Sequence, residues 1–141
     1  MSYEKVIIYY NFLVPVEVVF NAWTNEDLLR KWLFVGPTSE LTVILLDLRQ
    51  GGKFSFLELN KDTGKSIEHF GNFLIIDRPH RLSFTHFVRA HFEDVANIDI
   101  TIISNHEGAT LELIQTGVAK EVTEQRWREG LAQLKLTLEN Q

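Results

Sequence analysis

Six short segments rich in β-branched and aromatic residues follow one another through the middle of this 141-residue chain, with only brief turns between them. Parallel neighbours in a sheet need long crossover connections, whereas antiparallel neighbours need only a turn. The succession therefore predicts an antiparallel meander. Its clearest member is the sixth strand counted from the N-terminus, where isoleucines alternate with polar residues. The six segments cover residues 41–48, 54–58, 70–76, 82–86, 98–102 and 110–114.

Another strand and three helices complete the expected fold. A strand over residues 6–12 precedes the meander. Pro15 suits the first turn of a short helix, because the N–H that proline lacks would be unpaired there. Thr24, with Asp27 three residues later, resembles the capping box of a second short helix. Between residues 120 and 139, apolar residues recur at three- and four-residue spacing, which predicts a long helix with one buried stripe.

The resulting fold class is α+β: one strand, two short helices, six further strands and a long C-terminal helix. A large antiparallel sheet must bury one face. Because sheets twist, a seven-stranded sheet curls around the only element large enough to cover it, the last helix. One helix does not fill the whole concavity of such a sheet. We therefore expect a single domain over residues 1–141, with a hollow between the sheet and the last helix.

Short motifs in a fixed order cover nearly the whole chain. They include VPVEVVFNAWT at residues 14–24, DLRQGGKF at 47–54, IDRPHRLSFT at 76–85 and GATLEL at 108–113. Together they resemble the heat-shock-protein-ninety ATPase activator-like proteins of the START-like, or SRPBCC, superfamily, which includes the birch pollen allergen. The resemblance implies the helix-grip fold, in which a curved seven-stranded antiparallel sheet surrounds a long C-terminal helix and leaves a cavity between them.

Three positions depart from the family pattern. Arg126 stands where the family usually has glycine, immediately before the tryptophan of the last helix, and His86 stands where tryptophan is common. Ile75 stands where the family often has glutamate. This last departure removes a candidate cavity carboxylate and argues against any reaction that needs one.

The sequence contains no recognisable catalytic, metal-binding or cofactor-binding motif. The absence of cysteine excludes disulfides, thiolate zinc sites and a cysteine nucleophile. The five histidines have no metal-ligand spacing, and all except His86 are expected at the surface or in loops. Gly51-Gly52 lacks the lysine and the following helix of a phosphate-binding loop, and we interpret it as a turn or bulge that opens a strand. We therefore predict no catalytic residue, no metal and no cofactor.

Two polar residues still share strand parity with apolar ones. His86 lies in phase with Leu82 and Phe84, so it faces either the core or a ligand. Glu58 lies in phase with Phe54, but both faces of its strand carry apolar residues. For Glu58 a solvent-facing position is therefore favoured over a pocket acid with a raised pKa.

Aromatic residues are the strongest indication of a binding site. The chain has ten Phe, three Trp and three Tyr, which either pack against one another or line a pocket, since small-molecule sites are mostly apolar with a few polar groups. The fold that the resemblance implies favours a pocket. Its expected ligand contacts are Tyr10, Trp32, Phe54, Phe56, Phe73, Phe84, His86, Ile100, Gln115 and Trp127. Three of these residues are polar: Tyr10, His86 and Gln115.

The net charge of −5 disfavours nucleic acid and anionic membrane surfaces as partners. No apolar run approaches the ~20 residues of a membrane span, and the N-terminus lacks a signal-peptide pattern. We therefore expect a cytoplasmic protein without membrane insertion. The first functional hypothesis is noncatalytic binding of a small hydrophobic or amphipathic molecule, such as a lipid. The resemblance offers two alternatives: a protein-interaction module with a chaperone partner, and a polyketide-cyclase-like enzyme that would use Tyr10, Glu58 and His86.

Overall fold

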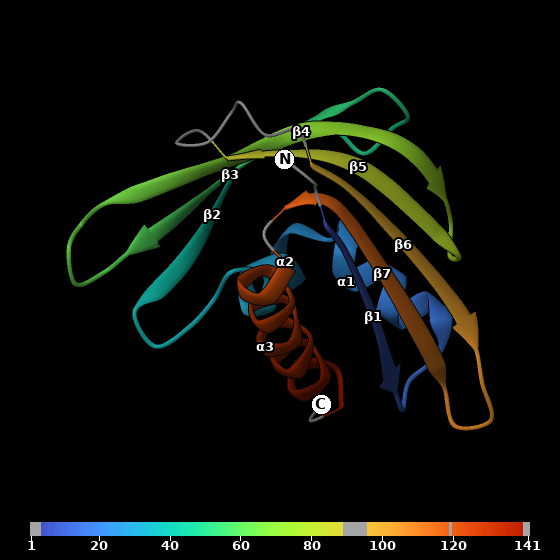
Figure 1. Cartoon of the computed structure of the whole chain (residues 1–141). Coiled ribbons are helices and arrows are strands. Elements are labelled where there is room, and N and C mark those ends of the chain that lie inside the picture. Colours follow the sequence, from blue (N-terminus) through green and yellow to red (C-terminus); the bar gives the residue numbers. More distant parts are fainter. Residues whose placement is uncertain (1–3, 89–95, 119, 140–141) are drawn as a thin grey trace.

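The computed structural model describes residues 4–88, 96–118 and 120–139. A seven-stranded antiparallel sheet arches over the C-terminal helix, and two short helices close the arch from behind (Figure 1). The strands are β1 Glu4–Phe12, β2 Ser39–Leu46, β3 Lys53–Asn60, β4 Ser66–Asp77, β5 Arg81–Val88, β6 Ala96–Ser104 and β7 Ala109–Val118. The helices are α1 Val16–Thr24, α2 Glu26–Trp32 and α3 Lys120–Glu139.

The order of strands across the sheet is β1-β7-β6-β5-β4-β3-β2. Strands β2 to β7 therefore form the expected meander, and β1 joins it at one edge by pairing with β7. This arrangement confirms the predicted α+β helix-grip fold. Strand β4 begins at Ser66, earlier than the apolar run from residue 70 had indicated, and that extension becomes important for the site.

The helix termini differ in one respect from the sequence prediction. Pro15 is the N-cap of α1, immediately before its first helical residue. Asn25, not Thr24, caps α2, because the Asn25 side chain accepts a hydrogen bond from the backbone N–H of Leu28 at 3.0 Å. Thr24 is the last residue of α1, and its hydroxyl donates back to the carbonyl of Phe20 at 3.4 Å. The predicted capping role of Thr24 is therefore wrong.

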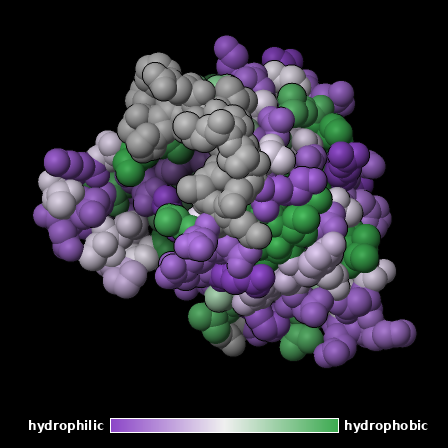
Figure 2. All heavy atoms as spheres, in the orientation of Figure 1, coloured by the Kyte–Doolittle hydropathy of each residue, from purple (hydrophilic) through white to green (hydrophobic). Residues whose placement is uncertain are grey.

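The core lies on the concave side of the sheet. Helix α3 buries Trp127, Leu131, Leu134 and Leu138, while its outward side is mainly hydrophilic (Figure 2), apart from exposed Val122 and Leu136. The main contacts of α3 are with β1, α1 and α2. The helix thus packs toward the β1 edge of the sheet, and the inner side of β3, β4 and β5 lies beyond these contacts.

Strands β4 and β5 approach each other closely at Gly71. A Cβ atom built at this position would lie 2.0 Å from the backbone carbonyl oxygen of Thr85 and 3.0 Å from the ring of Phe54. No side-chain movement relieves a clash with backbone. Only glycine therefore fits here without displacing β5.

We expect Gly71→Ala to lower the free energy of unfolding by roughly 2–3 kcal/mol, because overpacking forces the backbone to shift. Gly36→Ala is the matched control, since a Cβ atom at Gly36 meets no atom within 4 Å. Urea denaturation of both variants measures the difference. Equal stabilities would contradict the close approach of β4 and β5.

Candidate functional site

A hollow of about 500 Å³ lies between α3, the segment that follows α2, and the inner side of the sheet. We call it the α3 cavity. Aromatic rings of Trp32, Phe34 and Trp127 form one part of its wall, and Gly130 of α3 lies among the lining residues. Its volume is within the ~300–1,000 Å³ that small-molecule sites usually have. The polar side chains along its wall are those of Ser39, Glu58, His69, His86, Gln115, Thr123, Arg126 and Glu129.

The residues predicted to contact a ligand divide into three groups. Trp32, His86, Gln115 and Trp127 line the α3 cavity. Four phenylalanines lie deeper and pack on one another, with the Phe54 ring centroid 5.1–5.5 Å from the other three. The inner space that they enclose together with His86 and Trp127 holds only about 30 Å³. These four are Phe54, Phe56, Phe73 and Phe84.

Tyr10 and Ile100 line neither space. The Tyr10 ring lies 5.3 Å from that of Phe12, beside the core. Ile100 is fully buried in the centre of the sheet, between Leu82 of β5 and Leu113 of β7. Strand parity correctly turns both residues inward, but the packing of α1 and α3 against this part of the sheet leaves them away from the two cavities.

Three polar side chains meet on the inner side of neighbouring strands. In the strand register, His69 of β4 pairs with Phe56 of β3 and with Val88 of β5. Glu58 and His86 are therefore its diagonal neighbours, a position from which long side chains can touch. The sheet register thus brings together one carboxylate and two imidazoles.

These side chains form a continuous hydrogen-bonded series, the Glu58–His69–His86 chain. Glu58 Oε1 lies 2.8 Å from His69 Nε2, and His69 Nδ1 lies 2.9 Å from His86 Nε2. The His69 side chain is only 2% exposed and that of Glu58 14%. From α3, the Arg126 guanidinium donates to both Glu58 oxygens at 3.3 and 3.4 Å. A buried carboxylate with these two partners is satisfied as an anion.

The ionisation states follow from these surroundings. Burial by itself would raise the pKa of the Glu58 carboxyl, but the hydrogen bond from His69 and the charge of Arg126 outweigh it and leave the pKa below its usual value. Burial, then the neighbouring His69 and Arg126, lower the pKa of His86 to about 3. At neutral pH Glu58 is therefore ionised and His86 is neutral.

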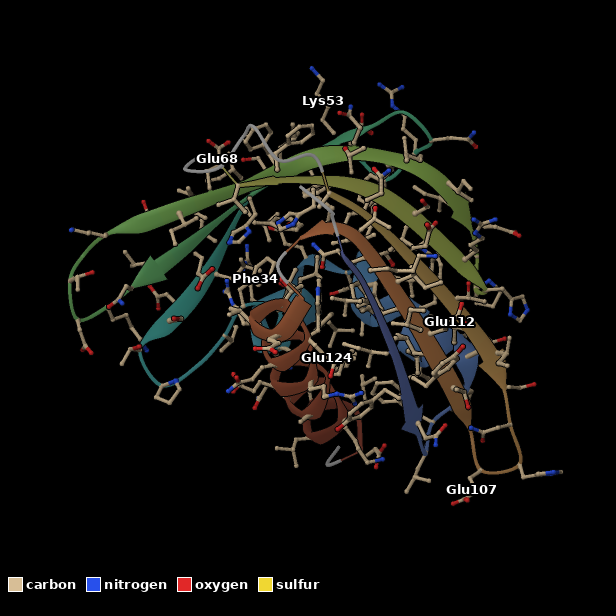
Figure 3. The ribbon with its side chains drawn as sticks, in the orientation of Figure 1. Phe34, Lys53, Glu68, Glu107, Glu112 and Glu124 are labelled. Carbon is tan, nitrogen blue, oxygen red and sulfur yellow. The ribbon has the colours of Figure 1, made fainter. Side chains whose placement is uncertain are left out.

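Phe34 covers this polar series. Its ring stacks on that of His69 with centroids 4.1 Å apart and lies 6.2 Å from the ring of Trp127. It sits under the arch of the sheet near the first turns of α3, whereas Glu68 lies on the outer side (Figure 3). Its φ of 56° is in the left-handed region, which costs a non-glycine residue roughly 1–2 kcal/mol. Packing on His69 and beside Trp127 holds this conformation, and Phe34 lines both spaces.

Two tryptophan N–H groups differ in their partners. The indole of Trp127 donates to Gln115 Oε1, which fixes the Gln115 amide at the cavity wall. The indole N–H of Trp23 is buried and, among the described residues, has no hydrogen-bond partner. An unsatisfied buried donor costs about 1–3 kcal/mol. Trp23 lines the inner space through the apolar part of its ring, and its buried N–H is not accessible from that space.

Glu58 and His69 were not expected in the site. The favoured solvent-facing position of Glu58 is wrong, because both of its oxygens turn inward to His69 and Arg126. His69 was expected in a loop or at the surface but is buried within β4, whose start the apolar run placed too late. The alternation of β3 placed Glu58 in phase with Phe54 and could have indicated that Glu58 faces inward. The contacts of His69 with Glu58 and with His86 depend on the strand register, which the sequence pattern does not give.

The remaining histidines take no part in this site. His80 bonds the Ile102 carbonyl oxygen from the turn before β5, and His106 is exposed. His91 lies outside the described residues. Within the described ranges, no group of three or more His, Cys, Asp or Glu side chains could hold a metal ion. Ile75 lines neither space, and among the described residues the carboxylates that line the α3 cavity are those of Glu58 and Glu129.

The sequence model of one family, described as Activator of Hsp90 ATPase homolog 1-like protein, matches residues 13–139. The chain belongs to this family. The comparison with curated proteins found no match. No helix in the described part of the chain has the length and apolar character needed to cross a bilayer.

Solved structures share the family's fold with this chain. A protein from Chromobacterium violaceum superposes with a TM-score of 0.89 and 23% identity, covering 96% of this chain and 97% of its own. A protein from Rhodobacter sphaeroides gives 0.86 and 16%, covering 99% of both chains. An AHSA1-like protein from Aeromonas hydrophila gives 0.80 and 22%, covering 97% and 93%. At these identities the likeness shows the fold alone.

The polar chain makes the stability of this family member depend on pH. Unfolded His86 takes up a proton below about pH 6.5, while folded His86 stays neutral down to about pH 3. In this window the unfolded state binds more protons, so stability falls as the pH falls. Glu58 acts in the same direction, because its lowered pKa gives stability that is present above its unfolded pKa and lost in acid.

We expect the wild type to lose about 2 kcal/mol more of its unfolding free energy than His86→Gln when the pH is lowered from about 7 to about 5. Urea denaturation at both pH values measures this difference. His106→Gln, a change at an exposed turn, is the control and should behave as the wild type. Identical pH dependence of the wild type and His86→Gln would show that His86 is not held neutral.

Proposed function

We propose that this protein binds a small amphipathic molecule noncatalytically in the α3 cavity. The observation that carries the proposal is the cavity itself: about 500 Å³, lined by both aromatic rings and polar side chains. Burial of the ligand's apolar part would supply most of the affinity, at roughly 25 cal/mol per Å². The polar groups would orient it.

The polar wall offers several kinds of hydrogen-bonding group. Gln115 uses its oxygen to accept from Trp127, which leaves the amide N–H groups for a ligand. Arg126 adds a positive charge above the ring of Phe34, with its guanidinium carbon 5.9 Å from the ring centroid. His86 adds a neutral imidazole. A ligand that combines an apolar part with an oxygen-bearing group matches this lining.

The other two hypotheses stay predictions. Family membership motivates a chaperone partner, but the proposed ligand site involves interior residues and needs no partner protein. For the cyclase-like alternative, Tyr10 lies apart from Glu58 and His86, outside the lining of the α3 cavity. The three residues named for that alternative therefore do not converge on one point.

A substitution that fills the cavity tests ligand binding. Gly130 lies on α3, and a Cβ atom there would meet only the Trp32 ring, at 4.0 Å. Gly130→Leu should keep the fold, because leucine favours helix over glycine by up to about 1 kcal/mol, while its side chain occupies the cavity. We expect at least a tenfold weaker affinity for any ligand that thermal-shift and native mass-spectrometry screens of amphipathic molecules detect with the wild type.

Ala132→Leu is the matched control, since Ala132 is exposed on the same helix. It should bind as the wild type does. A wild type that binds no member of lipid and aromatic libraries, or a Gly130→Leu variant that binds equally well, would overturn the proposal.

A further inference from the structure

The Glu58–His69–His86 chain ends at His86 Nδ1, a ring nitrogen for which the described residues provide no hydrogen-bond partner. His86 Nε2 is bonded to His69, whereas no described residue bonds His86 Nδ1. Among the described residues, the fully buried side-chain atom without a hydrogen-bond partner is Trp23 Nε1, not His86 Nδ1. His86 lines both the α3 cavity and the inner space. A ligand in the cavity can therefore reach it.

The carboxylate determines which atoms of the chain carry protons. Ionised Glu58 can only accept, so His69 Nε2 carries the hydrogen between them. While His69 is neutral, its Nδ1 is a bare acceptor, and His86 Nε2 must donate to it. His86 Nδ1 is then also bare. In its neutral form the chain presents a hydrogen-bond acceptor to the cavity.

We propose that the ligand carries a weakly acidic hydroxyl group, as in a phenol or an enol, and that the Glu58–His69–His86 chain accepts its proton. This inference rests on the proposed function and specifies the chemistry of the same ligand. Two of the three positions that depart from the family pattern, His86 and Arg126, belong to this site.

The transfer balances without any further reactant. The ligand O–H bond breaks, and its proton forms a bond to His86 Nδ1, which leaves the electron pair on the ligand oxygen. The Nε2 proton of His86 passes to His69 Nδ1 across their 2.9 Å contact. His69 then holds two protons as an imidazolium beside ionised Glu58, 2.8 Å away. The ligand is an anion that accepts a hydrogen bond from His86.

In the proposed transfer the proton comes to rest on His69. Its Nε2 atom lies 2.8 Å from the Glu58 carboxylate, which can pair with the imidazolium. His86 has no carboxylate partner among the described residues, and burial lowers its pKa to about 3, so the proton does not stay there. Among the described residues that line the cavity, the charged groups are Glu58 of the series itself, from β3, and Arg126 and Glu129 from α3. Arg126 pairs with Glu58 and stands near the ligand anion.

The absorbance of 4-nitrophenol tests the proposal, because its phenol and phenolate forms absorb at different wavelengths. We expect the bound probe to ionise at a pH at least one unit lower than the free probe, a tenfold shift in its ionisation equilibrium. Glu58→Gln removes the carboxylate that stabilises the imidazolium and should abolish this shift. Glu107→Gln, at the exposed turn before β7 (Figure 3), is the matched control and should retain it.

A second measurement reads the proton directly. Nitrogen-15 NMR of the histidine rings should show His69 doubly protonated only when nitrophenolate is bound to the wild type. This readout also covers the case in which Glu58→Gln fails to fold. A bound probe that ionises like the free one, or a His69 ring that stays neutral, overturns the inference.

The O-methylated analogue, 4-nitroanisole, separates this inference from the proposed function. It has a similar shape but no proton to transfer, so it should bind at least tenfold more weakly than 4-nitrophenol. Equal affinity of the two probes would overturn proton acceptance and leave the proposed ligand site intact. If neither probe binds and the wider screens detect no ligand, the proposed function and this inference both fail.

Discussion

The structure depends on one mismatch, a single long helix set against a seven-stranded curved sheet. Helix α3 packs mainly toward β1, α1 and α2, and its buried stripe completes the core there. The inner side of β3, β4 and β5 has no comparable helix against it. Phenylalanines fill the deepest part of that space, and the α3 cavity occupies the rest. The position of the cavity is thus a consequence of where the helix packs.

Polar side chains are tolerated on this inner face because they satisfy one another. A buried carboxylate without partners is expensive, but Glu58 bonds His69 and Arg126. A buried histidine likewise needs hydrogen-bond partners, and both ring nitrogens of His69 have one. Within the described part of the chain, the Nδ1 atom of His86 is the end of this series that no side chain bonds. The same satisfaction that stabilises the chain therefore gives the cavity a defined hydrogen-bonding group.

The family pattern and the structure together indicate what is particular to this protein. In the sequence analysis, Ile75 stood where the family resemblance led us to expect glutamate, and this argued against a carboxylate in the cavity. Glu58 on β3 supplies a carboxylate to the cavity, and Arg126, in place of the usual glycine, pairs with it. Solved relatives at about one-fifth identity share the fold with this chain. His86 and Arg126 are both among the residues that line the α3 cavity.

Local pattern in the sequence determined the element types, the meander and the long C-terminal helix, because alternation and three-to-four spacing are read within one segment. It also turned Phe54, Phe84 and His86 inward. Tertiary structure alone decided which inward residues meet, because diagonal contacts depend on the register between strands distant in sequence. The Glu58–His69–His86 chain follows from that register. The separation of the Phe cluster from the α3 cavity follows from the packing of the helices. Neither feature is encoded within a single segment of the sequence.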